Sequence, residues 1–506
     1  MPGPRIEAMP KAVPPAREKR PVPPCALVVF GASGDLTRRK LVPALYTLFA
    51  GGSLPPHFSV VGVARHPMMT DDFRDSMRAA ADEFARRKPE APVWHDFAAA
   101  LDYVQGEFGD PATYERLSVR LQQLDFQRGL EGNRLFYLAV PPGEVGGILR
   151  GLAAAGLLGP PEGSSWSRVV IEKPFGRDLE SARALNALVG GILDESQTFR
   201  IDHYLGKESV QNLLVFRFAN SMFEPLWNRK YVDYVEITAA ETVGIGTRGP
   251  FYDQTGVLRD IVQNHLLEVL ALTAMEPPTT GNPDDIRGEK LKVVNALRDP
   301  WSDTIPRDVV LGQYRGYREE PGVAAESVTP TFAALRVFVD NWRWQGVPFY
   351  LRAGKRLAKR ITEVAIHMQP IPLSLFGRDD VCETLAPNVL TLRIQPDEGI
   401  QLEFASKIPG DDLVVGKVKM DMTYTETFGG EPPEAYERLL LDAMHGDLTR
   451  FSRRDWVEAS WAWMDPILHH FEAHPPADFP NYEPGSWGPA ACDTWMRRDR
   501  RAWREL

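Results

Sequence analysis

The segment VVFGASGDLTRRK, residues 28–40, joins a short apolar run to a charged helical stretch through a turn of small residues. A buried strand that enters a helix through glycines is typical of the first unit of a dinucleotide-binding domain. The free N–H groups at the helix start favour a phosphate, and small side chains let it approach the backbone of Gly31, Ala32, Ser33 and Gly34. The spacing is not that of the GxGxxG fingerprint. A tight strand–helix turn that binds nothing therefore remains an alternative.

Strand–helix alternation continues from this segment to about residue 202. Near-continuous apolar runs suggest buried strands at FSVVGVAR (58–65), NRLFYLAVPP (133–142), SRVVIEKPFG (167–176) and QTFRIDHY (197–204). The stretch LESARALNALVGGIL (179–193) reads as a helix between two of them. Buried strands separated by helices indicate a parallel, doubly wound sheet. Residues 25–202 are therefore predicted to form an α/β, Rossmann-like dinucleotide-binding domain.

The pattern changes in residues 203–506, where polar and apolar residues alternate with period two. The runs are FAALRVFVDNW (332–342), NVLTLRIQP (388–396), GIQLEFASK (399–407) and VKMDMTY (418–424). In the last run one face is apolar: Val418, Met420, Met422 and Tyr424. Such alternation indicates half-exposed strands of an antiparallel sheet. With helices at 435–444 and 456–471, this part is predicted to be a larger α+β domain for substrate binding and dimerisation. Because such a sheet needs cover on its second face, we expect a homodimer or a dimer of dimers.

The composition restricts the class of protein. The chain has 506 residues and a net charge of −10, which disfavours a protein that coats nucleic acid. No apolar run is long enough to span a membrane. The three cysteines, Cys25, Cys382 and Cys492, form no CxxC pair, so we expect a reducing, cytoplasmic location and no metal centre. Residues 1–24 are rich in proline and charge and read as a flexible tail.

Arg65 stands at the end of the second predicted strand, in VGVARHP. In dinucleotide-binding folds an acidic residue at this place binds the ribose 2′-hydroxyl, whereas an arginine accommodates a 2′-phosphate. Arg65 therefore predicts NADP in preference to NAD. Taken alone, it also fits an ordinary solvated arginine.

His265 lies in GVLRDIVQNHLLEVLALTAM (256–275), where apolar residues recur at helical spacing. The spacing puts His265 on or beside the buried face of an amphipathic helix, where a histidine with satisfied hydrogen bonds is the alternative to a catalytic base. A buried base needs an acceptor on its second nitrogen, and Asp202 is a candidate. In an extended chain Asp202 and His203 would point to opposite sides.

Asp202 belongs to RIDHYLGKE (200–208), a stretch crowded with charge around one glycine. Lys207 begins a predicted helix and adds its charge to the N–H donors there. Together with His203 and Tyr204 it makes a plausible phosphate grip.

These segments occur in the order found in a known family. The motifs are GASGDLTRRK, NRLFYLAVPP, EKPFGRD, RIDHYLGKE, RDIVQNHLLE, NWRWQGVPFYLRAGK, IQPDEG, AYERLLLDAM and GSWGP. Together they closely resemble glucose-6-phosphate dehydrogenases from about residue 25 onward, and RIDHYLGKE is among the family's most specific signatures.

The resemblance implies oxidation of glucose 6-phosphate to 6-phosphoglucono-1,5-lactone with hydride transfer to NADP, the first step of the oxidative pentose phosphate pathway. His265 would remove the C1 hydroxyl proton and Asp202 would orient it. The implied substrate contacts are Lys173, His203, Tyr204, Lys207, Glu241, Asp260, Lys355 and Arg360. The implied cofactor contacts are Gly31, Ala32, Ser33, Gly34, Asp35, Leu36, Thr37, Arg38, Arg65 and Lys173. Pro174 follows Lys173 and is often cis in the family.

The chain departs from the family pattern at RGPFYDQTG (248–256), before Asp260, and Arg360 is lysine in some relatives. Some members bind a second, structural NADP. Two other functions remain: a related sugar or sugar-phosphate dehydrogenase, and a catalytically silent relative that binds NADP(H) and regulates a true dehydrogenase. The complete phosphate grip argues against the first, and retention of Asp202 and His265 argues against the second.

Overall fold

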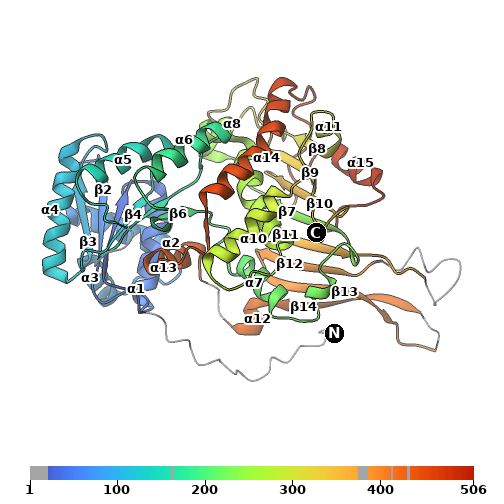
Figure 1. Ribbon diagram of the computed structural model, residues 1–506, viewed down its shortest axis with the longest axis horizontal. Helices are drawn as coiled ribbons and strands as arrows, with labels where there is room; N and C mark the ends of the chain where they lie inside the picture. The colour runs from blue at the N-terminus through green and yellow to red at the C-terminus, as the bar shows by residue number, and fades with distance from the viewer. Residues whose placement is uncertain (1–20, 161–164, 374–385, 412–413, 430–432) are drawn as a thin grey trace.

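Two sheets organise the computed structural model, which describes residues 21–160, 165–373, 386–411, 414–429 and 433–506 (Figure 1). Most of the predicted tail, residues 1–24, and Cys382 lie outside these ranges. Figure 1 shows an N-terminal body around one sheet and a larger body around the other. Within the described residues, every helix is too short or too polar to cross a membrane.

The first sheet has seven strands in the order β15-β6-β5-β4-β1-β2-β3, and every pair except β15–β6 is parallel. Its strands are β1 (Cys25–Phe30), β2 (Phe58–Ala64), β3 (Leu101–Gln105), β4 (Arg134–Leu138), β5 (Ser167–Ile171), β6 (Thr198–Ile201) and β15 (Phe451–Ser452). Its helices are η1 (Thr37–Leu41), α1 (Val42–Ala50), α2 (Thr70–Phe84), α3 (Ala91–Ala99), α4 (Pro111–Arg128), α5 (Pro142–Ala154) and α6 (Leu179–Gly190). The predicted Rossmann-like architecture is confirmed.

A segment from late in the chain completes this first sheet. Helix α13 (Ala435–His445) packs Leu439, Leu440 and Met444 into the same apolar cluster as strands β1 and β2. The short strand β15 then pairs with β6, and the rings of Phe451 and Phe199 meet edge to face at 4.9 Å. The predicted domain boundary at residue 202 stays a prediction. Residues 435–452 come much later in the chain and nevertheless pack with the N-terminal body.

The second sheet has eight strands in the order β14-β13-β12-β11-β7-β10-β9-β8. Only β10 and β7 run parallel, so the predicted mainly antiparallel sheet is confirmed. The strands are β7 (Val232–Ala240), β8 (Val309–Gly312), β9 (Phe332–Phe338), β10 (Pro348–Gly354), β11 (Ile361–Met368), β12 (Val389–Gln395), β13 (Gly399–Lys407) and β14 (Val415–Thr423).

The edge strand β14 leaves apolar side chains uncovered: Val418 is 37% exposed and Met420 is 49% exposed. The alternation predicted that Tyr424 would continue this apolar face. It does not, because Tyr424 begins the short helix α12 (Tyr424–Phe428). The strand therefore ends one residue earlier than the pattern suggested.

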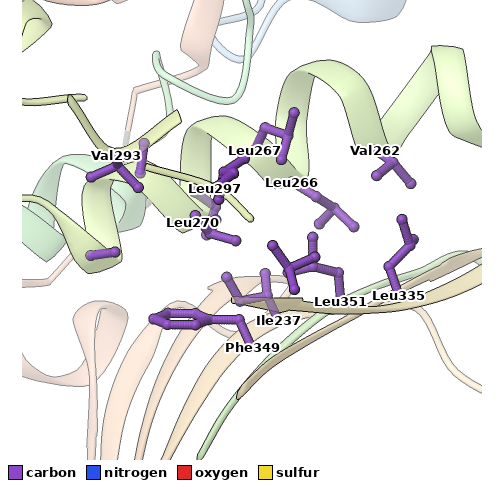
Figure 2. Packing of buried hydrophobic residues seen from close by; sticks show 14 of the residues in the cluster. Ile237, Val262, Leu266, Leu267, Leu270, Val293, Leu297, Leu335, Phe349 and Leu351 are labelled. Carbon is purple, nitrogen blue, oxygen red and sulfur yellow. The ribbon is translucent and has the colours of Figure 1, made fainter. Parts of the chain in front are cut away.

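A helical segment packs on the second sheet, and most of it beyond its first helix is buried. It comprises α8 (Gly249–Val257), the π-helical stretch η5 (Leu258–Leu266) and α9 (Leu267–Ala274). Figure 2 shows three of its side chains, Val262, Leu266 and Leu270, pointing at sheet residues Ile237, Leu335, Phe349 and Leu351. Helices α7 (Glu208–Phe218), α10 (Pro283–Asn295) and α14 (Arg454–Ala473) lie around it.

The apolar face predicted for residues 256–275 is present, and much of the opposite face of η5 is covered as well. The reason is α14, whose Ser460 Oγ accepts a hydrogen bond from Gln263 Nε2 at 2.8 Å on the side away from the sheet. A helix enclosed in this way holds His265 with little freedom.

The chain ends against the second sheet, past α15 (Ala490–Arg498). Arg504 donates from its guanidinium to Glu363 Oε1 and to Gln401 Oε1, both at 2.8 Å, and its main-chain N–H donates to Glu236 at 3.2 Å. Glu236 and Glu363 are buried. Arg504 thus compensates the charge of Glu363 on β11 and donates a main-chain hydrogen bond to Glu236 on β7. The chain end lies beside the second sheet (Figure 1).

Candidate active site

His265 and Asp202 form the centre of the candidate site. Asp202 directly follows strand β6, and His265 is the penultimate residue of η5. The Nδ1 atom of His265 lies 2.6 Å from Asp202 Oδ1, which also accepts a hydrogen bond from the main-chain N–H of Tyr204 at 2.9 Å. Both side chains are almost completely buried. The contact predicted between Asp202 and His265 is therefore present.

The charges around this pair set its protonation. Burial lowers the pKa of His265, the neighbouring Asp202 opposes this, and Lys173 lowers it further, so that the net shift is downward. For Asp202, burial would raise the pKa, but His265, His203 and Lys173 together hold it well below its usual range. A neutral imidazole beside an ionised carboxylate is the state that can accept a proton near neutral pH.

Lys173 fixes which nitrogen of His265 carries the lone pair. It follows β5 and joins Pro174 through a cis peptide bond, as the family resemblance led us to expect. Its Nζ lies 2.8 Å from His265 Nε2, 2.9 Å from the Asp260 carbonyl oxygen and 3.2 Å from Asp260 Oδ1. An ammonium can only donate. Nε2 is therefore the acceptor, while Nδ1 carries the hydrogen that faces Asp202.

The prediction that Asp202 and His203 point to opposite sides is wrong. The strand ends at Ile201, and Leu205 N–H donates to the Asp202 carbonyl at 3.0 Å, which closes a turn. As a result His203 and Tyr204 both reach the base: the His203 ring is 4.6 Å from the His265 ring, and the Tyr204 ring stacks on it at 4.1 Å. Tyr204 therefore supports the ring of His265.

Lys207 stands on the other side of Tyr204. Its Nζ lies 3.7 Å from the centre of the Tyr204 ring and 2.6 Å from Gln395 Oε1. Burial lowers the pKa of Lys207 to about 8, with Asp202 opposing the shift and Arg360 adding to it. Because a cation over an aromatic face is attracted to it, the stack Lys207–Tyr204–His265 joins the predicted phosphate grip to the base.

The remaining predicted substrate contacts gather at strand ends. Glu241 follows β7 and Lys355 follows the parallel strand β10, and their side chains form an ion pair. Burial would raise the pKa of Asp260, but Lys173, Lys355 and Arg248 hold it well below its usual range. Ionised carboxylates of this kind accept hydrogen bonds from hydroxyl groups. Arg360, by contrast, is exposed and reaches the group only through its charge.

The glycine turn packs closely against the residue that follows β4. Gly31 has φ +88°, and a Cβ atom there would lie 2.2 Å from the Ala139 carbonyl oxygen. The turn is closed by Gly34 N–H donating to the Gly31 oxygen at 2.9 Å and by the buried Thr37 hydroxyl donating to it at 3.1 Å. Ser33, Asp35 and Arg38 are exposed, whereas Ala32 is buried and Leu36 is half-buried. Arg65 is exposed directly after β2.

Asp202, His203 and His265 also offer ligand atoms within 4.8 Å of one another, a spacing that a metal ion could use. The Lys173 ammonium disfavours this reading, because it lies 2.8 Å from His265 Nε2 and would repel a metal cation. The group is better suited to moving a proton.

Sequence reasoning missed two contacts of the site. Gln395, which holds Lys207, comes from β12 far along the chain, and Arg248 lies 3.9 Å from Asp260 Oδ1. Gln395 belongs to the motif IQPDEG, so its presence was a signal, but nothing in the spacing connects it with Lys207.

Known proteins resemble this chain over nearly its whole length. The family model "Glucose-6-phosphate dehydrogenase, NAD binding domain" matches residues 28–212, and "Glucose-6-phosphate dehydrogenase, C-terminal domain" matches residues 214–504. The glucose-6-phosphate 1-dehydrogenase of Chlamydia pneumoniae is 45% identical over 500 residues, which cover 96% of this chain and 97% of that protein. Glucose-6-phosphate 1-dehydrogenase 2 of Mycobacterium tuberculosis is 45% identical over 95% of this chain and 94% of its own length.

Solved structures agree. The Mycobacterium avium glucose-6-phosphate 1-dehydrogenase has a TM-score of 0.80 at 38% identity, covering 96% of this chain and 99% of that one. A glucose-6-phosphate dehydrogenase in complex with its substrate glucose 6-phosphate has a TM-score of 0.87 at 32% identity, with the same coverage. The chain therefore belongs to the glucose-6-phosphate dehydrogenase family of oxidoreductases.

Proposed function

We propose that this chain oxidises glucose 6-phosphate at C1 to 6-phosphoglucono-1,5-lactone, with NADP as the hydride acceptor. The observation that carries the proposal is the placement of His265 between the Asp202 carboxylate and the Lys173 ammonium. This arrangement keeps the lone pair of a neutral His265 on Nε2, where a substrate hydroxyl can take the place of Lys173, next to a strand end of the dinucleotide-binding sheet. The family to which the chain belongs supports the choice of sugar.

In the proposed reaction, His265 Nε2 takes the proton of the C1 hydroxyl while the C1–H bond breaks and its hydride leaves. The C1–O bond becomes the lactone carbonyl. Asp202 stabilises the imidazolium that forms, and Tyr204 keeps its ring in place. The Lys173 ammonium must shift from Nε2 when the hydroxyl binds, and it remains close enough to polarise the developing carbonyl oxygen.

The chain's residues fit a bound dinucleotide. Gly31 is required where the turn packs against the Ala139 oxygen. The small residues that follow it, Ala32, Ser33 and Gly34, leave room for a phosphate near the start of the helix. Bound NADP supplies the hydride acceptor. Arg65, past the end of β2, is placed for a 2′-phosphate.

The direct test uses purified protein with glucose 6-phosphate and NADP, followed by the absorbance of NADPH. We expect turnover with this pair and little with free glucose, since the phosphate supplies binding energy that orients C1. Turnover with free glucose but none with the phosphate ester would contradict the assignment of Lys207 and its neighbours.

Arg65→Ala is expected to remove most of the preference for NADP. The ratio of kcat/KM for NADP to that for NAD should fall about 10–100-fold, the range for losing hydrogen bonds to a charged group. The values with NAD should change little, because NAD has no 2′-phosphate. An unchanged ratio would refute the role of Arg65.

Lys207→Ala is expected to raise the KM for glucose 6-phosphate about 10-fold or more while kcat changes little. Because burial lowers the pKa of Lys207 to about 8, its charge is present below that pH and lost above it. In the wild type, KM should therefore rise as pH increases through about 8, and this rise should vanish in the variant.

His203→Ala should also raise KM. The matched control is Lys359→Ala, which changes an exposed lysine in the connection between β10 and β11. This control should leave KM and its pH dependence as in the wild type. If Lys207→Ala and Lys359→Ala change KM equally, Lys207 does not bind the substrate phosphate.

We infer that a second copy covers the face of the second sheet opposite its helices, which gives a homodimer or a dimer of such dimers. Val418 and Met420 on β14 are exposed in the single chain. Light scattering on the purified protein distinguishes both from a monomer. A cytoplasmic location stays a prediction.

A further inference from the structure

An open depression of about 620 Å³ lies at the carboxyl ends of β2 and β3. Three arginines line it: Arg65 after β2, and Arg116 and Arg120 from helix α4. In an open parallel sheet this edge is where ligands bind. Among the residues that the structure describes, only Glu107 and Asp110 contribute carboxylates to the lining of the depression.

Local packing brings Arg116 to this edge. A Cβ atom on Gly106 would lie 2.1 Å from Thr113 Oγ1, so the glycine allows the first turn of α4 to sit directly on the end of β3. Arg116 Nη2 then donates to the Gln105 carbonyl oxygen at 3.1 Å and to Thr113 Oγ1 at 3.3 Å. These bonds use one nitrogen and hold the guanidinium at the strand end, which leaves its other N–H groups for a ligand.

The three arginines differ in how far their charge is already compensated. The charge of Arg120 is already compensated, because Arg120 forms an ion pair with the nearly buried Asp102. It also donates a hydrogen bond to Gln123 Oε1 at 3.0 Å. Arg116 lies 3.9 Å from Asp110 Oδ2, and since both side chains are about half exposed this pair contributes little. Arg65 forms no ion pair with any residue that the structure describes. Two of the three cations are thus available to an anion.

We propose that Arg116 is a second specificity-determining residue, which binds the 2′-phosphate of the adenosine moiety together with Arg65. The inference rests on the proposed use of NADP. A phosphate monoester has three acceptor oxygens and close to two negative charges near neutral pH, more than one guanidinium can satisfy. Arg65 reaches it from the strand end, and Arg116 reaches it from the helix that forms the wall of the same depression.

The test compares Arg116→Ala, Arg65→Ala and the double variant, with Arg150→Ala as control, since Arg150 is an exposed arginine on α5 outside the depression. For each, KM and kcat are measured with NADP and with NAD. Binding of adenosine 2′,5′-bisphosphate and of 5′-AMP is measured separately by competition. Both substituted residues are exposed, so all variants should fold, which thermal melting verifies.

We expect Arg116→Ala to raise the KM for NADP about 10-fold. It should weaken the binding of adenosine 2′,5′-bisphosphate by a similar factor. The KM for NAD, the inhibition by 5′-AMP and kcat should stay within about two-fold of the wild type. The double variant should have a higher KM for NADP than either single variant, and Arg150→Ala should behave as the wild type.

Three outcomes would overturn the inference in distinguishable ways. If Arg116→Ala weakens NADP and NAD equally, Arg116 contacts the part that they share. If it changes nothing while Arg65→Ala abolishes the preference for NADP, the second cation is absent but the proposed function stands. If neither variant alters the preference, the 2′-phosphate binds elsewhere and the proposed cofactor grip fails as well.

Discussion

Replacing His265 by asparagine is expected to lower kcat about 10²–10⁴-fold, the usual contribution of a general base. Asparagine can keep a hydrogen bond to Asp202 but cannot accept the C1 hydroxyl proton. The KM for glucose 6-phosphate should change little, since the proposed phosphate contacts lie on Lys207 and its neighbours. Steady-state kinetics of the purified variant measure both quantities.

The pH profile of the wild type gives a second measure of the same group. Burial lowers the pKa of His265, so the imidazole is neutral at neutral pH and kcat should fall only on the acid side, at a pH below the ordinary range of histidine. The acid limb should disappear from the residual activity of His265→Asn. If that variant keeps wild-type turnover, the base is another residue.

His367 offers a matched control. It is also a buried histidine beside a carboxylate, with Nε2 3.0 Å from Glu236 Oε1, and its ring stacks on Tyr234 at 4.0 Å. His367→Asn therefore makes the same chemical change in a similar environment on the second sheet. It should leave kcat of the folded enzyme nearly unchanged. Equal losses in the two variants would mean that His265→Asn acts through packing.

Replacing Arg504 by alanine is expected to lower the free energy of unfolding by about 3 kcal/mol, because it leaves buried carboxylates without their partner. Its guanidinium lies 2.8 Å from Glu363 Oε1, and both side chains are mostly buried. The shift of the urea or thermal midpoint measures the loss. Arg498→Ala, at an exposed arginine near the same end of the chain, should shift neither.

This loss should depend on pH with a definite sign. Burial raises the pKa of Glu363, and Arg504 opposes that rise, so removing Arg504 raises the pKa further. A carboxyl that binds its proton more tightly in the folded than in the unfolded chain favours folding at low pH. The destabilisation should therefore be full at neutral pH and shrink as pH falls. If the loss in free energy of unfolding does not depend on pH, it arises from the packing of the aliphatic part of Arg504 and not from its charge.

The sequence predicted those features that depend on neighbouring residues. Strand β1 and the turn at Gly31 follow from an apolar run and small residues. The need of a buried imidazole for an acceptor made Asp202 only a candidate partner of His265, and the family resemblance singled it out. What lay beyond prediction depends on distant segments. The turn after Ile201, which brings His203 to the base, overrides an extended pattern, and α14 buries the face of η5 that periodicity alone leaves to solvent.

Strand β3 was missed for a related reason. Its residues, LDYVQ, include Asp102, which is buried beside Arg120, and a charged residue within a short run conceals a buried strand. The same ion pair compensates the charge of Arg120, whereas Arg116 keeps N–H groups free for the proposed 2′-phosphate contact. Neither the pair nor the depression can be read from spacing along the chain.

The late arrival of α13 and β15 has a consequence for how the protein is made. During synthesis the dinucleotide-binding body emerges first, yet the edge of β6 and the apolar surface that receives Leu439 and Met444 stay open until residues 435–452 leave the ribosome. The nascent chain must keep this surface from aggregating through most of translation. A gene truncated after the first body should accordingly yield insoluble product, although every strand of the parallel core is encoded in it.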